Sequence, residues 1–273
     1  MMGSRMETPP PLTTHESMLV KLGRLVIDGT EGARALTSLF LRTLWFTFKG
    51  SRPKGSTAQQ AFEIGNNSAS FLALTMGFIG MILVYQSAVQ LGRLVPDYSM
   101  VGANYGELLV RELGPTIGAL MLATRVGAGM AAEIASMVVT EQVDALRLCA
   151  ADPVDFLVVP RFLASLVMTL VVVVLSSAVA YATGAITAFI AFDVRFDVFA
   201  NLSLVDFGDV ATGLTKSIAY GAAIPICSCH CGLEAHGGSA GVGRATTAAV
   251  VLSSLAIIVL NFFISAGAFL VGL

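Results

Sequence analysis

The sequence predicts an all-α integral membrane protein with about five transmembrane helices, preceded by an amphipathic helix at the membrane interface. Of its 273 residues, 55% are hydrophobic and 12% are charged, and the mean hydropathy is +0.80. A soluble domain carries about twice that charged fraction. Residues 162–192 and 245–273 contain no Asp, Glu, Lys or Arg. Each run exceeds the roughly 20 residues that a helix needs to cross a bilayer.

The N-terminal part divides into two regions. Residues 1–14 are polar and rich in proline, which predicts a disordered tail. Residues 15–66 predict an interfacial, elbow-like helical region, since Leu36, Phe40, Leu44 and Phe48 recur at helical spacing among basic and polar positions. The alternative is a soluble helix packed on a partner. Glycine and proline between residues 50 and 56 are expected to break the helix.

The transmembrane domain is expected over residues 67–273. The predicted spans are residues 68–91, about 105–125, 162–192, 210–229 and 245–273. A polar helical segment, 133–148, follows the second span, and Asp152-Pro153 predicts the start of the next helix. The glycine-rich run 232–243 predicts a loop that ends in a tight turn, with Thr246 and Thr247 in the first turn of the last helix.

The distribution of basic residues predicts the orientation. Twelve of the 16 Lys and Arg fall in segments on the N-terminal side of the membrane, two fall in the opposite loops, and two fall within spans. Basic residues collect on the cytoplasmic side. The N-terminus is therefore expected inside and, after five spans, the C-terminus outside.

No catalytic or metal motif is found. The sequence lacks G-x-x-x-x-G-K-[ST], H-E-x-x-H and G-x-S-x-G, so no catalytic residue, cofactor or nucleic-acid partner is expected. Cys227, Cys229 and Cys231 alternate with other residues, whereas zinc sites usually place two residues between paired cysteines. We interpret them as small packing residues, with metal binding as the alternative.

Charged residues within spans are more informative, because an ionisable group inside a bilayer is costly and usually pairs or faces a water-filled cavity. Arg111, Glu112 and Lys216 are such residues. Adjacent helical residues point about 100° apart, so Arg111 and Glu112 cannot share one partner. One is expected to face a cavity near the outer leaflet. Alternatively, the span begins after both. Gly114 and Gly118 form a G-x-x-x-G that allows close helix approach.

Many short motifs, in order, resemble those of the MlaE permease family. They cover roughly residues 15–273 and include Arg111-Glu112-Leu113-Gly114-Pro115, Arg125-Val126-Gly127, Thr140-Glu141-Gln142, Asp144-Ala145-Leu146, Asp152-Pro153, Val159-Pro160-Arg161, Lys216, Gly237-Gly238, Gly241-Val242-Gly243 and Ala245-Thr246-Thr247-Ala248. The tail of about 14 residues and the extra thiols near Cys229 depart from the family pattern.

The resemblance implies the membrane subunit of an ABC transporter that moves phospholipid or another lipid between the bacterial inner membrane and the outer envelope, as in systems that maintain outer-membrane lipid asymmetry. It implies a homodimer of this chain, two copies of a cytoplasmic ATPase, a hexameric periplasmic MCE-domain protein and a periplasmic C-terminus. Arg111 and Glu112 would lie by the lipid cavity between protomers. The coupling helix that docks on the ATPase would include Glu133, Glu141, Gln142, Asp144 and Leu146.

Two other functions remain open at this stage. One is a membrane scaffold that anchors an MCE protein without transporting lipid. The other is an ion-coupled secondary transporter, which needs titratable groups at mid-membrane and internal repeats. Lys216 is the one such group found, and no clear repeat is present.

Overall fold

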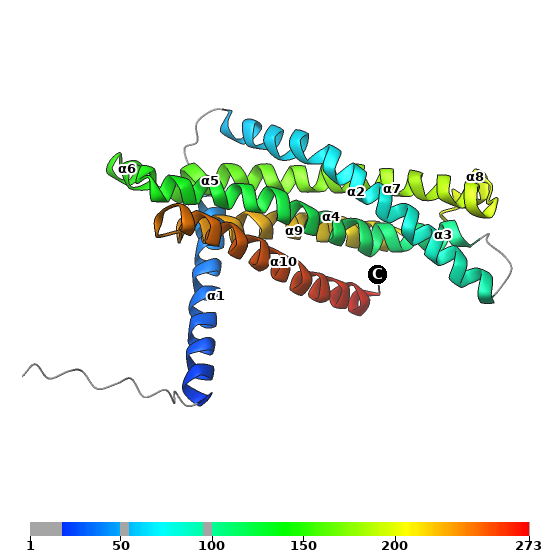
Figure 1. Ribbon diagram of the computed structural model, residues 1–273, viewed down its shortest axis with the longest axis horizontal. Coiled ribbons are helices and arrows are strands. Elements are labelled where there is room, and N and C mark those ends of the chain that lie inside the picture. The colour runs from blue at the N-terminus through cyan, green and yellow to red at the C-terminus, as the bar shows by residue number, and fades with distance from the viewer. Residues whose placement is uncertain (1–17, 50–54, 95–99, 273) are drawn as a thin grey trace, which may run out of the picture.

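The computed structural model describes residues 18–49, 55–94 and 100–272, and this part of the chain is helical, without strands. The predicted disordered tail lies outside the described residues. The elements, drawn in Figure 1, are α1 (Met18–Lys49), α2 (Ser56–Leu94), α3 (Val101–Leu108), η1 (Leu109–Leu113), α4 (Gly114–Leu122), η2 (Ala123–Gly127), α5 (Ala128–Val139), α6 (Gln142–Leu148), η3 (Val154–Val158), α7 (Val159–Phe192), α8 (Phe196–Phe199), α9 (Phe207–Leu233) and α10 (Gly238–Val271).

Four helical stretches are long and apolar enough to cross a membrane. They are Ser56–Arg93, Val101–Val139, Val154–Phe192 and Gly238–Val271. The first three each contain one predicted span, and the fourth covers the predicted span 245–273 up to Val271. The second stretch joins α3 to α5 through two short π-helical segments, η1 and η2. All four are longer than the sequence predicts, because the helices continue past the apolar runs into polar residues at the bundle ends.

The remaining predicted span, α9, is less apolar and is not among these four. It nevertheless runs the length of the bundle. Near its start, Asp206 lines a cavity together with Gly272, which follows the end of α10. At its other end, Gly232 packs against Ile134 of α5. The structure therefore contains a bundle of five long helices, with α9 beside α7 and α10 (Figure 1).

Small residues allow the helices to approach closely. The most extensive contact joins α2 and α7, where a Cβ at Gly80 would overlap the backbone of Ala180. Gly114 and Gly118, the predicted G-x-x-x-G, face Ser177 and Val173 of α7. This motif therefore brings together two helices of the same chain. Because lipid is as apolar as a leucine side chain, such close packing is a main source of helix association in membranes.

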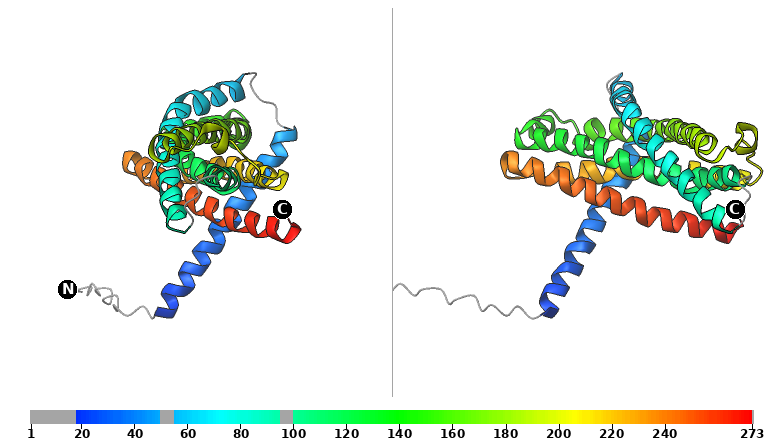
Figure 2. Two further views of the ribbon diagram at one scale, coloured as in Figure 1. Left: turned by 90° about the vertical axis from the view of Figure 1, so that its right-hand side faces the viewer. Right: turned by 45° about the vertical axis from the view of Figure 1, so that its right-hand side comes forward.

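Helix α1 projects away from the bundle and runs across its long axis (Figure 2). It contacts the bundle through Leu39 and Phe46, and an ion pair of 2.9 Å joins Arg42 to Asp152. Trp45 and Phe48 stay exposed. The helix of the predicted N-terminal region is therefore present with exposed aromatic side chains, and its location in the membrane interface stays a prediction.

Two predictions of local structure are wrong. The expected helix 133–148 is interrupted, since α5 ends at Val139 and Glu141 adopts a left-handed conformation with φ of 60° before α6 begins. The expected loop 232–243 is mostly helical, because α10 begins at Gly238 and Thr246 and Thr247 lie beyond its first turn. Close packing explains the glycine at position 241, since a Cβ there would overlap the His236 carbonyl. The start at Asp152-Pro153 is confirmed, with Asp152 accepting a hydrogen bond from the Val154 amide at 2.9 Å.

Candidate functional site

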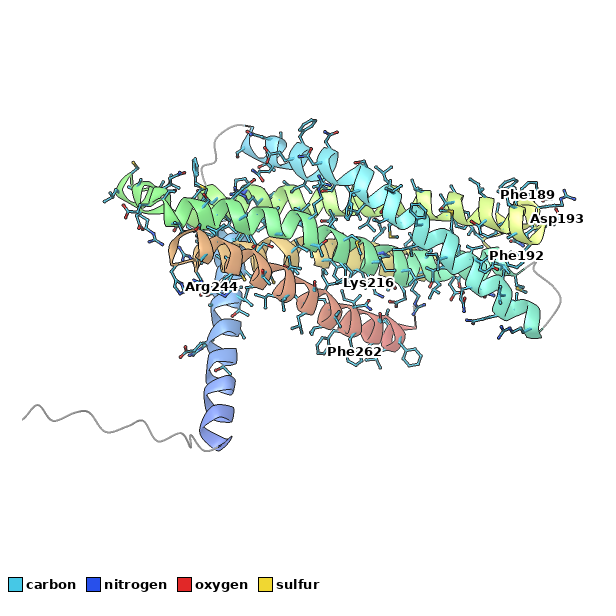
Figure 3. The ribbon with its side chains drawn as sticks, in the orientation of Figure 1. Phe189, Phe192, Asp193, Lys216, Arg244 and Phe262 are labelled. Carbon is cyan, nitrogen blue, oxygen red and sulfur yellow. The ribbon has the colours of Figure 1, made fainter. Side chains whose placement is uncertain are left out.

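A buried ion pair lies in the middle of the bundle. Lys216 of α9 is fully buried, and its Nζ lies 2.6 Å from Oε1 of Glu112 in η1. The same ammonium group donates a hydrogen bond of 3.2 Å to the Arg111 carbonyl. Ser265 of α10 donates to Glu112 Oε1 at 2.9 Å. Lys216 lies between the end of the bundle marked by Arg244 and the end marked by Asp193 (Figure 3).

Arg111 pairs with Asp209, which lies on α9 like Lys216. Its Nη1 lies 2.9 Å from Oδ1 of Asp209, whose side chain is 6% exposed. Asp209 is fixed in place because it forms a capping box with Asp206 at the start of α9. The prediction that adjacent Arg111 and Glu112 reach separate partners is confirmed. The sequence did not identify either partner, although the spacing Asp206-x-x-Asp209 before an apolar run was an available capping signal.

The backbone of η1 positions the two charges. Residues 109–113 form a π-helical turn, and such turns are frequent at functional sites because they shift the direction of the side chains. Helix α9 approaches this turn closely, since a Cβ at Gly213 would overlap the Val110 carbonyl oxygen. Glycine at position 213 therefore permits the contact that brings Asp209 and Lys216 to the two charges on η1.

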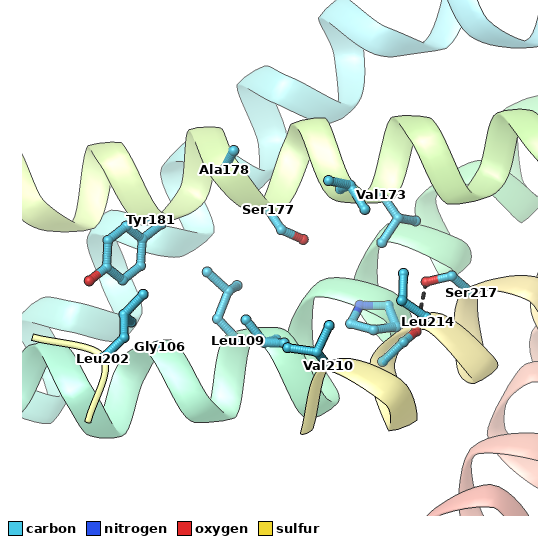
Figure 4. Close-up of a pocket in the computed structure, with 14 residues that line it drawn as sticks. Gly106, Leu109, Val173, Ser177, Ala178, Tyr181, Leu202, Val210, Leu214 and Ser217 are labelled. Atoms are coloured by element: carbon cyan, nitrogen blue, oxygen red, sulfur yellow. Dashed lines mark hydrogen bonds between the residues drawn. The ribbon is translucent and has the colours of Figure 1, made fainter. Parts of the chain in front are cut away.

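An apolar cavity of about 350 Å³ opens beside these pairs. Its walls come from α3, η1 and α4, from α7, and from α9, and Figure 4 shows Ser177, Leu109 and Val210 pointing toward one another from these walls. The lining residues are Gly106, Leu109, Val110, Pro115, Val173, Val174, Ser177, Ala178, Tyr181, Leu202, Val210, Gly213, Leu214 and Ser217. Arg111 and Glu112 do not line this cavity. Val110, immediately before Arg111, and Ser217, immediately after Lys216, line it.

Arg111 instead lines a polar cavity of about 450 Å³ near the C-terminal end of α10. Glu107, Asp206 and Asp209 share this cavity. The Arg111–Asp209 pair therefore lies at the polar cavity, while Val110, adjacent to Arg111, lines the apolar one.

The predicted coupling residues fall in two places. Glu141, Gln142 and Asp144 are exposed around the start of α6, and Asp144 pairs with Arg147 at 2.8 Å. Leu146 is half-buried, and Val143 anchors α6 as its one buried residue. Glu133 lies on α5 instead, where it pairs with the buried Arg161 of α7 at 2.9 Å.

The three clustered cysteines lie within the bundle. Cys227 and Cys229 are buried and Cys231 is half-buried, and all three are free thiols. Within residues 18–49, 55–94 and 100–272, no group of three or more His, Cys, Asp or Glu side chains is placed to hold a metal ion. Cys229 packs in a hydrophobic cluster with Ile134 and Phe162, in line with a packing role.

The fold and the site define a multi-pass α-helical membrane protein with paired charges and an apolar cavity inside its bundle. The family Permease MlaE matches residues 57–266, and the chain belongs to this family. A probable ABC transporter permease of Synechocystis is 37% identical over 222 residues, which are 80% of this chain and 83% of the relative. A Rickettsia typhi protein of the same description is 37% identical over 76% of this chain and 80% of its own length.

A plant relative carries a lipid in its name. The chloroplastic protein TRIGALACTOSYLDIACYLGLYCEROL 1 of Arabidopsis thaliana is 33% identical over 220 residues, which cover 80% of this chain and 62% of the relative. Membership of an ABC permease family implies a membrane subunit that works with an ATPase.

Proposed function

We propose that this chain is the membrane subunit of an ABC transporter that moves phospholipid, or another lipid, between the bacterial inner membrane and a periplasmic MCE-domain protein. A separate ATPase subunit would hydrolyse ATP. The observation that carries this proposal is the apolar cavity of about 350 Å³ beside the Glu112–Lys216 pair. Family membership and the lipid in the name of the Arabidopsis relative support it.

The physical need for such a cavity is clear. Moving a two-chain lipid out of the bilayer exposes roughly 30 methylene groups, at about 0.8 kcal/mol each, or on the order of 25 kcal/mol. That surface must pass from one apolar shelter to another. An apolar cavity of about 350 Å³ bordered by charges supplies a shelter for part of the chains and a polar boundary for the headgroup. In a dimer, this cavity would adjoin the space between the protomers, with Arg111 and Glu112 at its edge.

The α5–α6 region would couple the bundle to the ATPase. Glu141, Gln142 and Asp144 present polar groups on a short helix that stands clear of the bundle end (Figure 1), and Leu146 adds an apolar contact. The Glu133–Arg161 pair would transmit a movement of this region to α7. Two ATPase copies would act on a homodimer of this chain.

The helix α10 offers a surface for homodimer formation. Of the four membrane-capable stretches it is the least buried. In its apolar 18-residue segment 17% of the residues are buried, against 33–44% in the corresponding segments of the other three. Phe262 and Phe263 are among its exposed side chains. The orientation proposed is an N-terminus in the cytoplasm and a C-terminus in the periplasm, so that α6 faces the ATPase and the opposite end faces the hexameric MCE protein.

Reconstitution tests the proposal. The chain, its ATPase and its MCE partner would be placed in vesicles with fluorescent phospholipid, and ATP-dependent lipid exchange with the MCE protein would be followed. Exchange that requires both ATP and this chain is expected. ATP hydrolysis that is insensitive to lipid, together with absence of exchange, would instead identify a scaffold that only anchors the MCE protein.

A further inference from the structure

A second, polar cavity lies near the end of the bundle that carries α6. It has a volume of about 360 Å³ and lies between the first turns of α2 and the segment η2–α5. The residues that line it recur at helical spacing on each side. On one side they are positions 60, 63–64 and 67–68 of α2, and on the other they are positions 125–126, 129–130 and 133 of η2 and α5. The cavity is therefore a groove between two helix faces. It lies close to the inner limits of two apolar runs, at Ser68 and Arg125.

The groove contains a cation without a carboxylate partner. Arg125 lines the groove and is exposed, and none of the ion pairs among the described residues includes it. Its guanidinium carbon lies 5.9 Å from the centroid of the Phe71 ring, a cation–π distance. A guanidinium at the edge of the hydrocarbon layer is strongly stabilised by an anion, and its planar fork of donors suits a phosphate.

The groove also contains an uncompensated anion. Of its two carboxylates, Glu133 is neutralised by Arg161 at 2.9 Å. Glu63 is half-buried, and it accepts a hydrogen bond of 3.3 Å from the neutral Gln59 amide. The groove therefore combines one free positive and one free negative charge. A simple anion would be attracted by Arg125 and repelled by Glu63, whereas a zwitterion satisfies both.

A buried hydroxyl in the same wall lacks a partner. Ser68 is 1% exposed, and its Oγ makes no hydrogen bond within the described structure. A buried polar group without a partner is costly, and nearly all such groups in proteins are satisfied. A phosphate ester oxygen in the groove would accept this hydrogen bond.

An apolar stripe continues from the groove along the same face of α2. Phe71 follows Asn67 by one helical turn, and the stripe then extends through Leu74, Phe78, Ile82 and Tyr85. The last four are each more than half exposed. A ligand whose polar end occupies the groove could lay hydrocarbon chains along this stripe. This continuity favours a lipid over a soluble phosphate ester.

We propose that the groove binds the headgroup of a zwitterionic glycerophospholipid of the leaflet nearest α6, such as phosphatidylethanolamine. Arg125 and the Ser68 hydroxyl bind the phosphate, Glu63 binds the ammonium group, and the acyl chains follow the α2 stripe. This inference deepens the proposed function and rests on it, since it names the class of lipid that the transporter loads.

The test is photolabelling of the transporter complex in nanodiscs of phosphatidylglycerol. One sample contains a small amount of phosphatidylethanolamine with a photoreactive group at the start of an acyl chain, and the other contains the matching phosphatidylglycerol probe. Labelled peptides are identified by mass spectrometry. We expect the phosphatidylethanolamine probe to label residues 60–74 and 125–133 more strongly than the phosphatidylglycerol probe. Equal labelling by the two probes would overturn the zwitterion assignment.

Three variants separate the roles of the charges. Arg125→Gln is expected to lower labelling by the phosphatidylethanolamine probe about tenfold, the usual effect of losing a charged hydrogen-bonding pair, whereas Arg125→Lys keeps part of it. Glu63→Gln should abolish the preference between the two probes. The control Arg244→Gln removes an exposed arginine near the start of α10 and should leave labelling unchanged. Wild-type labelling in Arg125→Gln would contradict the proposal, and melting temperatures establish that each variant is folded.

Soluble competition distinguishes a lipid from a free phosphate ester. Glycerophosphoethanolamine carries the same headgroup without acyl chains, and it should displace the probe only at a large excess. Displacement at concentrations similar to that of the lipid would identify a site for soluble esters and overturn the lipid assignment. The labelling is measured without ATP, so it is independent of transport. A complex that exchanges lipid but is not labelled in the groove would reject this site and leave the proposed function intact. A complex that is labelled in the groove but does not exchange lipid would support the site and reject the proposed function.

Discussion

Lys216 Nζ and Glu112 Oε1 lie 2.6 Å apart inside the bundle, and they form one of two charge pairs between the same two helices. Arg111, adjacent to Glu112, pairs with Asp209, which precedes Lys216 on α9 by two helical turns. The two pairs fix the register of α9 against η1, because a shift of either helix would separate opposite charges at both positions.

Removal of one member of the buried pair should be strongly destabilising. Lys216→Met leaves the Glu112 carboxylate, which is 29% exposed, without its cation, and breaking a buried pair in this way costs up to about 3–5 kcal/mol. We expect a marked decrease in the melting temperature of the detergent-solubilised protein.

The double variant Lys216→Met/Glu112→Gln should recover most of this loss, because no uncompensated charge then remains in the bundle. The control is Arg195→Ala, which removes an exposed pair with Asp197 and should change stability by less than about 1 kcal/mol. A double variant as unstable as Lys216→Met would show that the pair is not the source of the effect.

The close approach of α9 to η1 gives a second prediction. Gly213→Val places a branched side chain where even a Cβ overlaps the Val110 carbonyl, so α9 must move away from η1. We expect lower stability and loss of lipid exchange, measured in the same vesicle assay. Gly243→Ala is the matched control, because a Cβ at Gly243 meets no atom within 4 Å. Normal exchange by Gly213→Val would contradict the need for this contact.

The apolar cavity itself can be filled. Ser177→Trp adds a large side chain to the α7 wall of the cavity, which has a volume of about 350 Å³. We expect the variant to fold but to lose lipid exchange, because the indole occupies space needed by an acyl chain. Leu175→Trp is the control, since Leu175 is 57% exposed and does not line the cavity. Equal exchange by the two variants would argue against transport through this cavity.

Much of the fold could be predicted from the sequence because apolar runs of this length leave few alternatives. Within the described residues the predicted spans all coincide with helices, including α9, which contains both Lys216 and Pro225. Predictions failed where packing overrides local preference. Gly238, Gly241 and Gly243 predict a loop, but all three lie in α10. Of these, Gly241 packs closely against the His236 carbonyl, whereas a Cβ at Gly238 or Gly243 would meet no atom within 4 Å.

The site was only partly predictable for a related reason. An unpaired charge in a bilayer is unfavourable, so Arg111, Glu112 and Lys216 could be singled out by composition alone. Their pairing depends on how α9 lies against η1, which is a property of the tertiary structure. Asp209 and Ser265 were not identified because one resembles an ordinary helix cap and the other an ordinary small residue of a span.

The last prediction concerns coupling at α6. Asp144→Ala breaks an exposed pair with Arg147, so stability should change by less than about 1 kcal/mol. If α6 docks on the ATPase, however, the variant should exchange less lipid for each ATP hydrolysed, because hydrolysis would no longer move the bundle efficiently. The measurement is the ratio of lipid exchange to phosphate release in the reconstituted complex, with Arg195→Ala as an exposed-pair control away from α6.

Glu141→Gly tests the same surface without disturbing the backbone, since glycine readily adopts the left-handed conformation found at position 141. An unchanged ratio in both α6 variants would place the ATPase contact elsewhere on the chain.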